Sequence, residues 1–506
     1  MRPRQRTRPR PARHSTLAAL LCAALSSGCT VDQRAEVERY RAVIDEGATP
    51  PEYRSGEPLS LRTAVALTRL QNEALSIEGE AYLRSLIERQ RRASSLMPTL
   101  DAFGSLTFRD ETSGGGGGDN DGGGSSSDGV LFDAGLGAQY TLFTGLSDFN
   151  RVRASELTIE QRRWLLLDLR ETLMLDTARA YYAVLLAERL TRVIQSSLEV
   201  QEERLRDIRG RRSVGFARPL DVAQIEAQAS ATRVQLLDAK NQAANARSAL
   251  ALLTGAELSG TALSDEFAPP GDDLDVNSAL ELARARRQDL AAVAASANAA
   301  RAEVDAALGR FYPSVTVNFD YFLTRDTIPS DRDWAGILTV NLPLFTAGRL
   351  EADLREAWSL FREEVLRYSL TFREVRRDVE VAIADLAATR ARVTETVTQV
   401  RVAEEALRQA EASYQAGLGT NLERIVAQDQ FLSAEISQSR EQYSEKVAYL
   451  ALMRAAGVLT EVIAGAVPPS ADVLPRRAVP EAPFIVAPPS GSGGSTSAEP
   501  AASTVN

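Results

Sequence analysis

The sequence predicts an α+β membrane protein in which an internal duplication supplies four strands per chain to a β-barrel that several copies share, continuous with a long coiled-coil α-barrel. Three observations support this fold class. Landmark motifs recur about 200 residues apart along the chain, and four segments alternate between apolar and polar residues. Two very long stretches also have a helical pattern, and one of them has an apolar residue at every seventh position.

The composition restricts the chemistry. The chain has 506 residues and a formal net charge of −10. Its single histidine, His14, and its two cysteines, Cys22 and Cys29, all lie near the N-terminus. If residues 1–28 are a leader that is removed, the mature chain has no histidine and at most one cysteine. It then cannot form a Ser-His-Asp triad, a zinc cluster or a structural disulfide. We therefore expect no enzymatic activity and no cofactor, and the acidic balance argues against nucleic acid as a partner.

Residues 1–28 have the layout of a secretory signal peptide. Six arginines precede an apolar run at 17–25 that is too short to span a bilayer, and small residues lead up to Cys29. A disordered basic tail is the alternative. The small residues before Cys29 resemble the lipobox of bacterial lipoproteins, although Ser26 stands where leucine is usual. That resemblance implies lipidation of Cys29, a lipid-anchored extension at 29–59, and an outer membrane location.

The duplication organises the rest of the chain. Phe143 recurs as Phe345 and Gly215 as Gly417, both 202 residues later in similar local sequence. The units are a first repeat at 60–263, a linker at 264–275, a second repeat at 276–465, and a disordered tail rich in Pro, Ser and Gly at 466–506. The glycine-rich loop 113–129 accounts for the extra length of the first copy.

Each repeat predicts the same order of elements: a helix, two strands, a long helix and a shorter helix. The expected helices are 60–97, 146–212 and 220–254 in the first copy, and 276–312, 348–415 and 422–457 in the second. In the helix at 348–415, the apolar row runs in steps of seven from Trp358 to Tyr414. So strict a repeat indicates supercoiling against neighbouring helices. A cytoskeletal-type rod would give the same pattern.

The four alternating segments lie at 99–109, 130–142, 314–324 and 334–344. Their lengths are close to the ~9–11 residues that a tilted transmembrane strand requires. A soluble two-faced sheet is the alternative. In lipid, four strands with open edges would leave backbone groups unpaired, so we expect oligomerisation, and three copies would supply twelve strands.

In the order and duplication of its motifs, the chain resembles the TolC-type outer membrane efflux protein family over about residues 55–460. The motifs are the segment LSLRTAVAL at 59–67, the strand starts at Pro98 and Pro313, the Pro343-Leu344-Phe345 pattern before Gly348, and Tyr414-Gln415-Ala416-Gly417. The resemblance implies a homotrimeric efflux conduit without catalysis, reaching from the outer membrane into the periplasm. Its partners would be a periplasmic adaptor and an inner membrane pump. A duct for type I protein secretion and a coiled-coil envelope protein without a pore are the alternatives.

The resemblance also implies a periplasmic gate at two helix-hairpin tips. Tyr414 and Asp221 match the tyrosine and the aspartate of the family's latch, but Gly419 stands where its arginine is expected, and Arg218 is a possible substitute. Val426 aligns with the aspartate of the constriction, and Glu423 retains an acid one turn earlier, so the resemblance implies a weakened cation site. The tip residues Gly215, Phe216, Gly417 and Leu418 would contact the adaptor. Solvated hairpins without a gate are the alternative, with Tyr414 as a core residue.

Two further motifs do not predict a site. The glycine run at 114–124 lacks the GK[ST] of a phosphate loop and precedes a strand, and its aspartates predict no strong calcium site. The paired acids Asp272-Asp273 and Glu404-Glu405 have no apolar pocket that would raise a pKa, so hydrolase chemistry is not expected.

Overall fold

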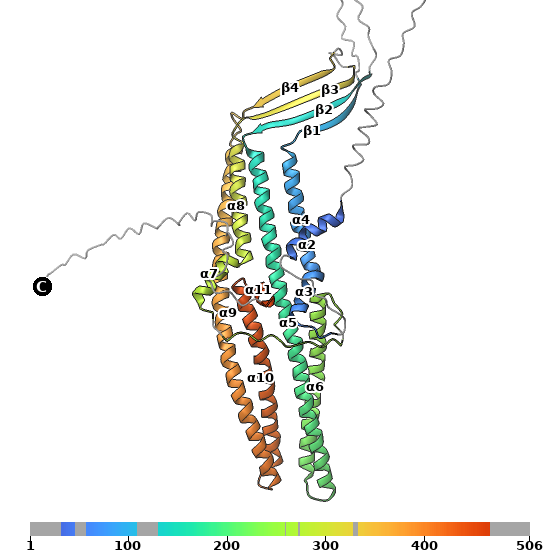
Figure 1. Cartoon of the computed structure of the whole chain (residues 1–506), viewed down its shortest axis with the longest axis vertical. Helices are drawn as coiled ribbons and strands as arrows, with labels where there is room; N and C mark the ends of the chain where they lie inside the picture. The colour runs from blue at the N-terminus through green and yellow to red at the C-terminus, as the bar shows by residue number, and fades with distance from the viewer. Residues whose placement is uncertain are drawn as a thin grey trace, which may run out of the picture.

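The computed structural model describes residues 32–45, 57–108, 130–258, 260–271, 274–326 and 332–465. The predicted signal peptide, Cys29, the glycine-rich loop, the Asp272-Asp273 pair and the C-terminal tail lie outside these residues. The molecule is elongated, with a small sheet at one end and two helical hairpins at the other (Figure 1). Among the described helices, none combines the length and apolar character needed to cross a bilayer.

Four antiparallel strands form one sheet in the order β1-β2-β3-β4. They are β1 (Thr99–Phe108), β2 (Val130–Thr144), β3 (Ser314–Arg325) and β4 (Trp334–Asn341). The register places apolar residues opposite one another: Leu106 pairs with Phe132, Leu136 with Tyr321, and Val317 with Leu338. The predicted strands are confirmed, and their apolar positions share one face. β1 and β4 are the two edges, and neither has a second partner strand within the described chain.

Two continuous helices of 67 residues each, α5 (Ser147–Ser213) and α9 (Arg349–Gln415), run from the sheet to the far end of the molecule (Figure 1). At ~1.5 Å per residue each is about 100 Å long. The heptad row from Trp358 to Tyr414 is buried or half-buried along its whole length. The predicted long helices and the heptad row are therefore confirmed.

Shorter helices lie beside the long ones. On the sheet side these are α4 (Glu73–Ser94) and α8 (Gln288–Gly309), and on the tip side α6 (Pro219–Thr254) and α10 (Asn421–Ala455). The expectation of single helices at 60–97 and 276–312 is wrong, because α3 (Leu61–Gln71) and α7 (Val276–Arg286) are separate elements. The chain is extended at Asn72 and Arg287, which have ψ angles of 123° and 127°.

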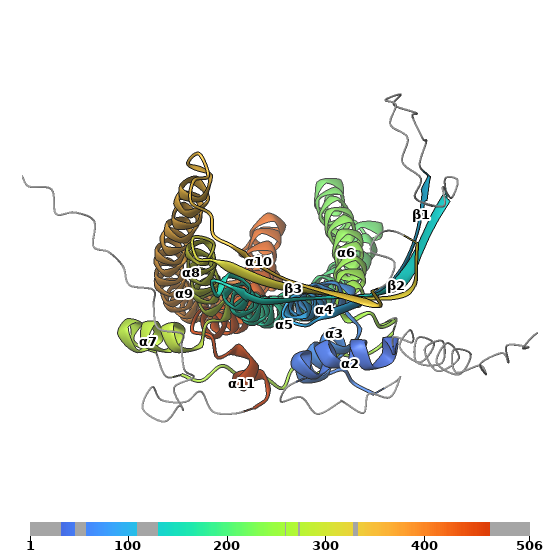
Figure 2. The same cartoon turned by 90° about the horizontal axis from the view of Figure 1, so that it is seen from above.

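Two small helices complete the described chain: α2 (Gln33–Ile44) and α11 (Leu459–Ile463). Together with α3 and α7 they lie on one side of the row of long helices (Figure 2). The main apolar core joins α3, α10 and α11 to the middle of α5 around Tyr181 and Tyr182. The Tyr181 hydroxyl donates to the carbonyl of Leu59 at 2.8 Å, which fixes the start of the first repeat against α5.

Candidate functional site: the hairpin tips and the mid-helix groove

The turns between α5 and α6 and between α9 and α10 form the two tips farthest from the sheet (Figure 1). Gly215 and Gly417 adopt left-handed backbone angles, with φ of 83° and 75°. After each glycine, an amide reaches back to the preceding helix: Phe216 N donates to Arg211 O at 2.8 Å, and Leu418 N to Ser413 O at 2.9 Å. Both tips thus end the long helix with the same glycine-dependent cap.

The side chains beyond these glycines project into solvent. Phe216 is 83% exposed and Leu418 is 88% exposed. A large apolar side chain at the extreme end of a hairpin has no intramolecular packing to explain it. The placement fits a contact surface for another protein, and the adaptor-contacting role remains a prediction.

Asp221 makes its main contacts within its own tip. Arg218 donates to the Asp221 carboxylate from Nη2 at 2.9 Å and from Nε at 3.1 Å, and its backbone amide donates at 3.3 Å. These hydrogen bonds hold the pKa of the Asp221 carboxyl below its usual value and raise the pKa of Arg218. The pair stabilises the start of α6, as expected for a carboxylate near a helix N-terminus.

Glu423 occupies the equivalent place in the second tip. Its carboxylate accepts from the amide of Thr420 at 3.0 Å, while the Thr420 hydroxyl accepts from the Glu423 amide at 3.2 Å. This reciprocal pair is a capping box at the start of α10. The Glu423 carboxylate is therefore bonded to its own backbone. The exposed Val426 lies one turn further along α10.

The structure does not bring Tyr414 and Asp221 into hydrogen-bond contact, but two other side chains connect them. The guanidinium of Arg424 lies over the Tyr414 ring, 4.2 Å from its centroid. Arg424 Nη2 donates to Asn421 Oδ1 at 3.0 Å, and Asn421 Nδ2 makes a long hydrogen bond of 3.5 Å to the backbone carbonyl of Asp221. This chain of contacts crosses from one hairpin to the other.

The sequence reasoning missed Arg424 and Asn421. Both are buried, with 8% and 3% exposure, and they lie in the row of α10 that also buries Ala427, Gln428 and Leu432. An arginine in an otherwise buried helical row was the available signal, because a buried charge needs a specific partner.

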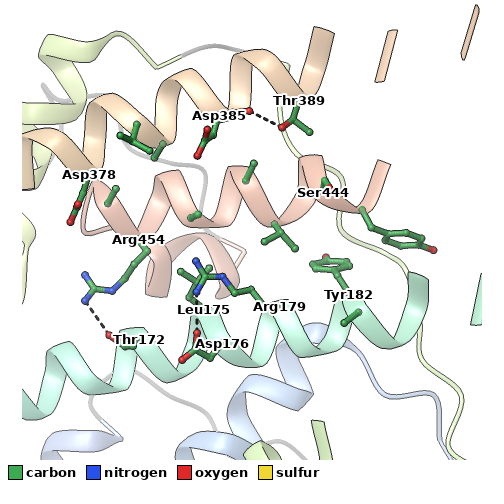
Figure 3. A pocket seen from close by; sticks show the side chains of 18 of the residues that line it. Thr172, Leu175, Asp176, Arg179, Tyr182, Asp378, Asp385, Thr389, Ser444 and Arg454 are labelled. Carbon is green, nitrogen blue, oxygen red and sulfur yellow. Dashed lines mark hydrogen bonds and ion pairs between the residues drawn. The ribbon is translucent and has the colours of Figure 1, made fainter. Parts of the chain in front are cut away.

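A second candidate site is a groove of about 890 Å³ between α5, α9 and α10, near the point where α10 ends (Figure 3). Arg179 and Leu186 of α5 line it, on the opposite side of that helix from Thr177, which contacts Thr68 of α3. Its apolar lining residues are mainly alanine, valine and leucine. Its charged lining residues are Asp176, Arg179, Arg287, Arg377, Asp378, Asp385, Arg392 and Arg454.

Arg454 connects the rim of this groove to a buried ionic network. It forms an ion pair with Asp168 and a hydrogen bond of 3.3 Å to Thr172. Glu171, which is 1% exposed, accepts from Gln288 at 2.9 Å and from Thr460 at 3.3 Å. Burial raises the pKa of the Glu171 carboxyl, against the opposing charges of Arg454 and Arg170. The network joins α5, α8, α10 and α11.

The described residues include no group of three or more His, Cys, Asp or Glu side chains placed to hold a metal ion.

The chain is similar to known proteins in both sequence and structure. The family model described as outer membrane efflux protein matches residues 87–256 and 279–458. The chain is 27% identical over 331 residues to the probable efflux pump outer membrane protein SepC of Pseudomonas putida, covering 60% of this chain and 68% of that protein. It is 24% identical over 299 residues to the outer membrane protein TolC of Vibrio cholerae, covering 57% and 68%.

Two solved structures share the fold. The structure of CusC has a TM-score of 0.70 and 18% identity, covering 80% of this chain and 95% of that one. The outer membrane protein VceC of Vibrio cholerae has a TM-score of 0.68 and 22% identity, covering 78% and 96%. The family match spans more than half of the residues and includes strands, long helices and both tips. The chain belongs to the outer membrane efflux protein family.

Proposed function

We propose that this protein is the outer membrane channel of a tripartite efflux system, a passive conduit for small molecules. In this proposal three copies form the channel, an inner membrane pump drives export, and a periplasmic adaptor joins the two. The relatives described as toluene and antibiotic efflux pump outer membrane proteins support small-molecule export.

The observation that carries the proposal is the open four-stranded sheet directly joined to helices about 100 Å long. One face of the sheet carries large exposed apolar residues, among them Leu106, Leu323 and Leu338. Such a face suits lipid, but the two free edges do not, because unpaired backbone groups in hydrocarbon are costly. A barrel that is closed by several copies satisfies both requirements, and it would continue into a helical tunnel.

The test is conductance. The full-length chain, purified in detergent and added to planar lipid bilayers, should produce discrete current steps, and chemical cross-linking in the same detergent should stop at a trimer. A chain that cross-links as expected but never conducts would refute a channel and favour a coiled-coil envelope protein.

A gene deletion in the bacterium that produces this protein distinguishes small-molecule efflux from protein secretion. Deleting the gene should increase sensitivity to organic solvents or antibiotics, and a plasmid copy should restore resistance. Loss of a secreted protein with unchanged drug sensitivity would instead indicate a type I secretion duct.

We further propose that Cys29 carries the lipid anchor and that the tip residues Gly215, Phe216, Gly417 and Leu418 meet the adaptor. The 83–88% exposure of Phe216 and Leu418 supports the second role. Asp221, Arg218, Glu423 and Tyr414 remain the proposed gate residues. In this proposal the first three shape the tips, while Tyr414 packs against Arg424 of its own hairpin, which is connected to the other hairpin through Asn421.

A further inference from the structure

The groove between α5, α9 and α10 contains one carboxylate that the fold leaves without a counter-charge. Asp176 pairs with Arg179 at 3.1 Å, and Asp378 pairs with Arg377 at 2.8 Å. Asp385, the third carboxylate that lines the groove, forms no ion pair and accepts no hydrogen bond on its side chain from the residues that the structure describes. Asp385 is exposed, and its oxygens point from α9 toward α10 (Figure 3).

The arginines of the groove do not supply the missing counter-charge. Each of the five arginines that line it forms an ion pair with a carboxylate of its own. Besides the two pairs given above, these pairs are Arg287–Asp289, Arg392–Glu441 and Arg454–Asp168. The charge that remains uncompensated in the groove is therefore the single negative charge of Asp385.

An apolar surface lies beside this carboxylate. On α10, Ala448, Ala451 and Ala455 follow one another at spacings of three and four residues, so they share one face of the helix. Their small side chains leave a recess between the two long helices. Val381, one turn before Asp385 on α9, extends the apolar surface up to the carboxylate. A ligand can therefore place an apolar body against the alanines while its charge meets Asp385.

The volume and the charge of the groove together define a class of ligand. About 890 Å³ lies within the range of ~300–1,000 Å³ that small-molecule sites occupy. An apolar anion would bring a second negative charge beside Asp385, and a neutral apolar body would cover the carboxylate without compensating its charge. The complementary ligand is a compact organic cation with an apolar or aromatic body.

We propose that this groove is a binding site for apolar organic cations, with Asp385 as the counter-charge and the alanine face of α10 as the contact surface. The site follows from the groove itself, while its role in transport rests on the proposed channel function. The groove opens on the side of α5 away from α3. In the proposed trimer, α2, α3, α7 and α11 would cover the outside, so the groove would face the passage (Figure 2). Cations of this class would then bind there during export.

Equilibrium dialysis of the full-length protein in detergent tests the site, with the same detergent without protein as the blank. The probe is tetraphenylphosphonium, and tetraphenylborate is an anion of the same shape. Asp385→Asn keeps the size of an exposed side chain and removes its charge, so the variant should fold normally. It should weaken tetraphenylphosphonium binding about fivefold, as expected for an ion pair at a solvent-accessible carboxylate. It should not weaken tetraphenylborate binding.

Two further variants locate the binding. Ala451→Phe fills the recess and keeps Asp385, so it should weaken the binding of both ions. Asp238→Asn removes an exposed carboxylate of α6, a helix that does not line the groove, and should bind both ions as the wild type does. Equal tetraphenylphosphonium affinity in Asp385→Asn and the wild type would overturn the proposal. An equal loss in Asp385→Asn and Asp238→Asn would overturn it as well, because surface charge alone would then explain the binding.

Binding and conduction are measured separately, so the two proposals can fail separately. A chain that conducts but binds tetraphenylphosphonium equally with and without the Asp385 charge refutes the site and leaves the channel function. A chain that shows the expected difference in binding but never conducts refutes the channel function and leaves the site.

Discussion

Glu171 is a carboxylate that the fold keeps almost entirely from water. It lies in the middle of α5 where α8, α10 and α11 converge, with 1% exposure and hydrogen bonds from Gln288 and Thr460. Arg454 Nη1 approaches its second oxygen only to 4.0 Å. Since burial of the charge outweighs these partners, the pKa of Glu171 is raised.

A raised pKa fixes the sign of the pH dependence. The folded chain binds the Glu171 proton more tightly than the unfolded chain, whose pKa is near ~4.3. The stability that this group contributes is therefore complete at low pH and is lost as the pH rises through the folded pKa. Glu171→Gln should avoid that loss, so its free energy of unfolding at pH 8 should be higher than that of the wild type.

Denaturant unfolding in detergent at pH 5 and pH 8 measures this effect. The difference between Glu171→Gln and wild type should be larger at pH 8. Glu202→Gln, at a half-exposed ion pair with Arg233, is the control and should behave alike at both pH values. An equal difference for Glu171→Gln at both values would contradict the predicted pKa direction.

At the scale of elements, the junction between sheet and helices depends on two glycines in contact. Gly145 directly follows β2 and has a φ of 64°, and the next residue, Leu146, has a φ of 67°. A Cβ on Gly145 would lie 2.0 Å from the carbonyl oxygen of Gly309, and a Cβ on Gly309 would lie 2.6 Å from the carbonyl oxygen of Gly145. The start of α5 thus packs backbone to backbone against the end of α8, which joins the two repeats.

Gly309→Ala should destabilise this junction. Because the clashing atoms belong to the backbone, the helices must move apart, at a cost of about 1–3 kcal/mol. The measurement is the unfolding midpoint in detergent. Gly104→Ala is the matched control, since nothing lies within 4 Å of its added Cβ. Equal midpoints for Gly309→Ala and Gly104→Ala would contradict this close packing.

The elements differ in how well sequence predicts them. Period-two alternation and heptad spacing predict the strands and the 67-residue helices well, because each pattern covers many residues. The breaks at Asn72 and Arg287 contain neither glycine nor proline. Asn72 caps α4 locally, since its Oδ1 accepts from the Ala74 amide at 3.0 Å, and distant contacts support both breaks: Asn72 donates to the carbonyl of Leu253 at 3.0 Å, and Arg287 pairs with Asp378 at 3.3 Å. Helix α2 likewise depends on Tyr40 packing over Gly79.

Some residues of the candidate site can likewise be predicted from local sequence, and others cannot. The turn glycines and the helix-capping acids have local signals, so Gly215, Gly417, Asp221 and Glu423 lie at the tips where sequence puts them. The residues that join the two hairpins have no local sequence signal. Arg204 of α5 forms an ion pair with Glu411 of α9, and this contact depends on how the two hairpins pack against each other. The residue spacing within either hairpin does not determine that packing.

For the whole molecule, the outer helices carry apolar residues without an intramolecular partner. On α6, Leu220, Val234, Leu237 and Leu252 are each more than half exposed, at roughly heptad spacing along one side. Such a row is typical of a helix that packs against another helix. In the proposed trimer, α6 and α9 stand at the two ends of each chain's row of helices and would meet their neighbours there (Figure 2).

Val234→Glu should therefore prevent assembly, because it places an unpaired charge in the proposed interface. Light scattering coupled to size exclusion in detergent would show a monomer in place of a trimer. Gln235→Glu adds the same charge at an exposed neighbouring position off this row and should leave the mass unchanged. A Val234→Glu protein with the wild-type mass would place the interface elsewhere.

The two free edges of the sheet have a consequence for how the protein is made. A single chain in lipid would leave one side of β1 and one side of β4 without backbone partners. In water, the same edges and the apolar face favour aggregation. For the proposed channel, biogenesis therefore has a fixed order in which strands of different chains must pair before, or during, insertion. Until then each newly exported chain depends on something else to cover its sheet, and export, assembly and insertion become one coupled process.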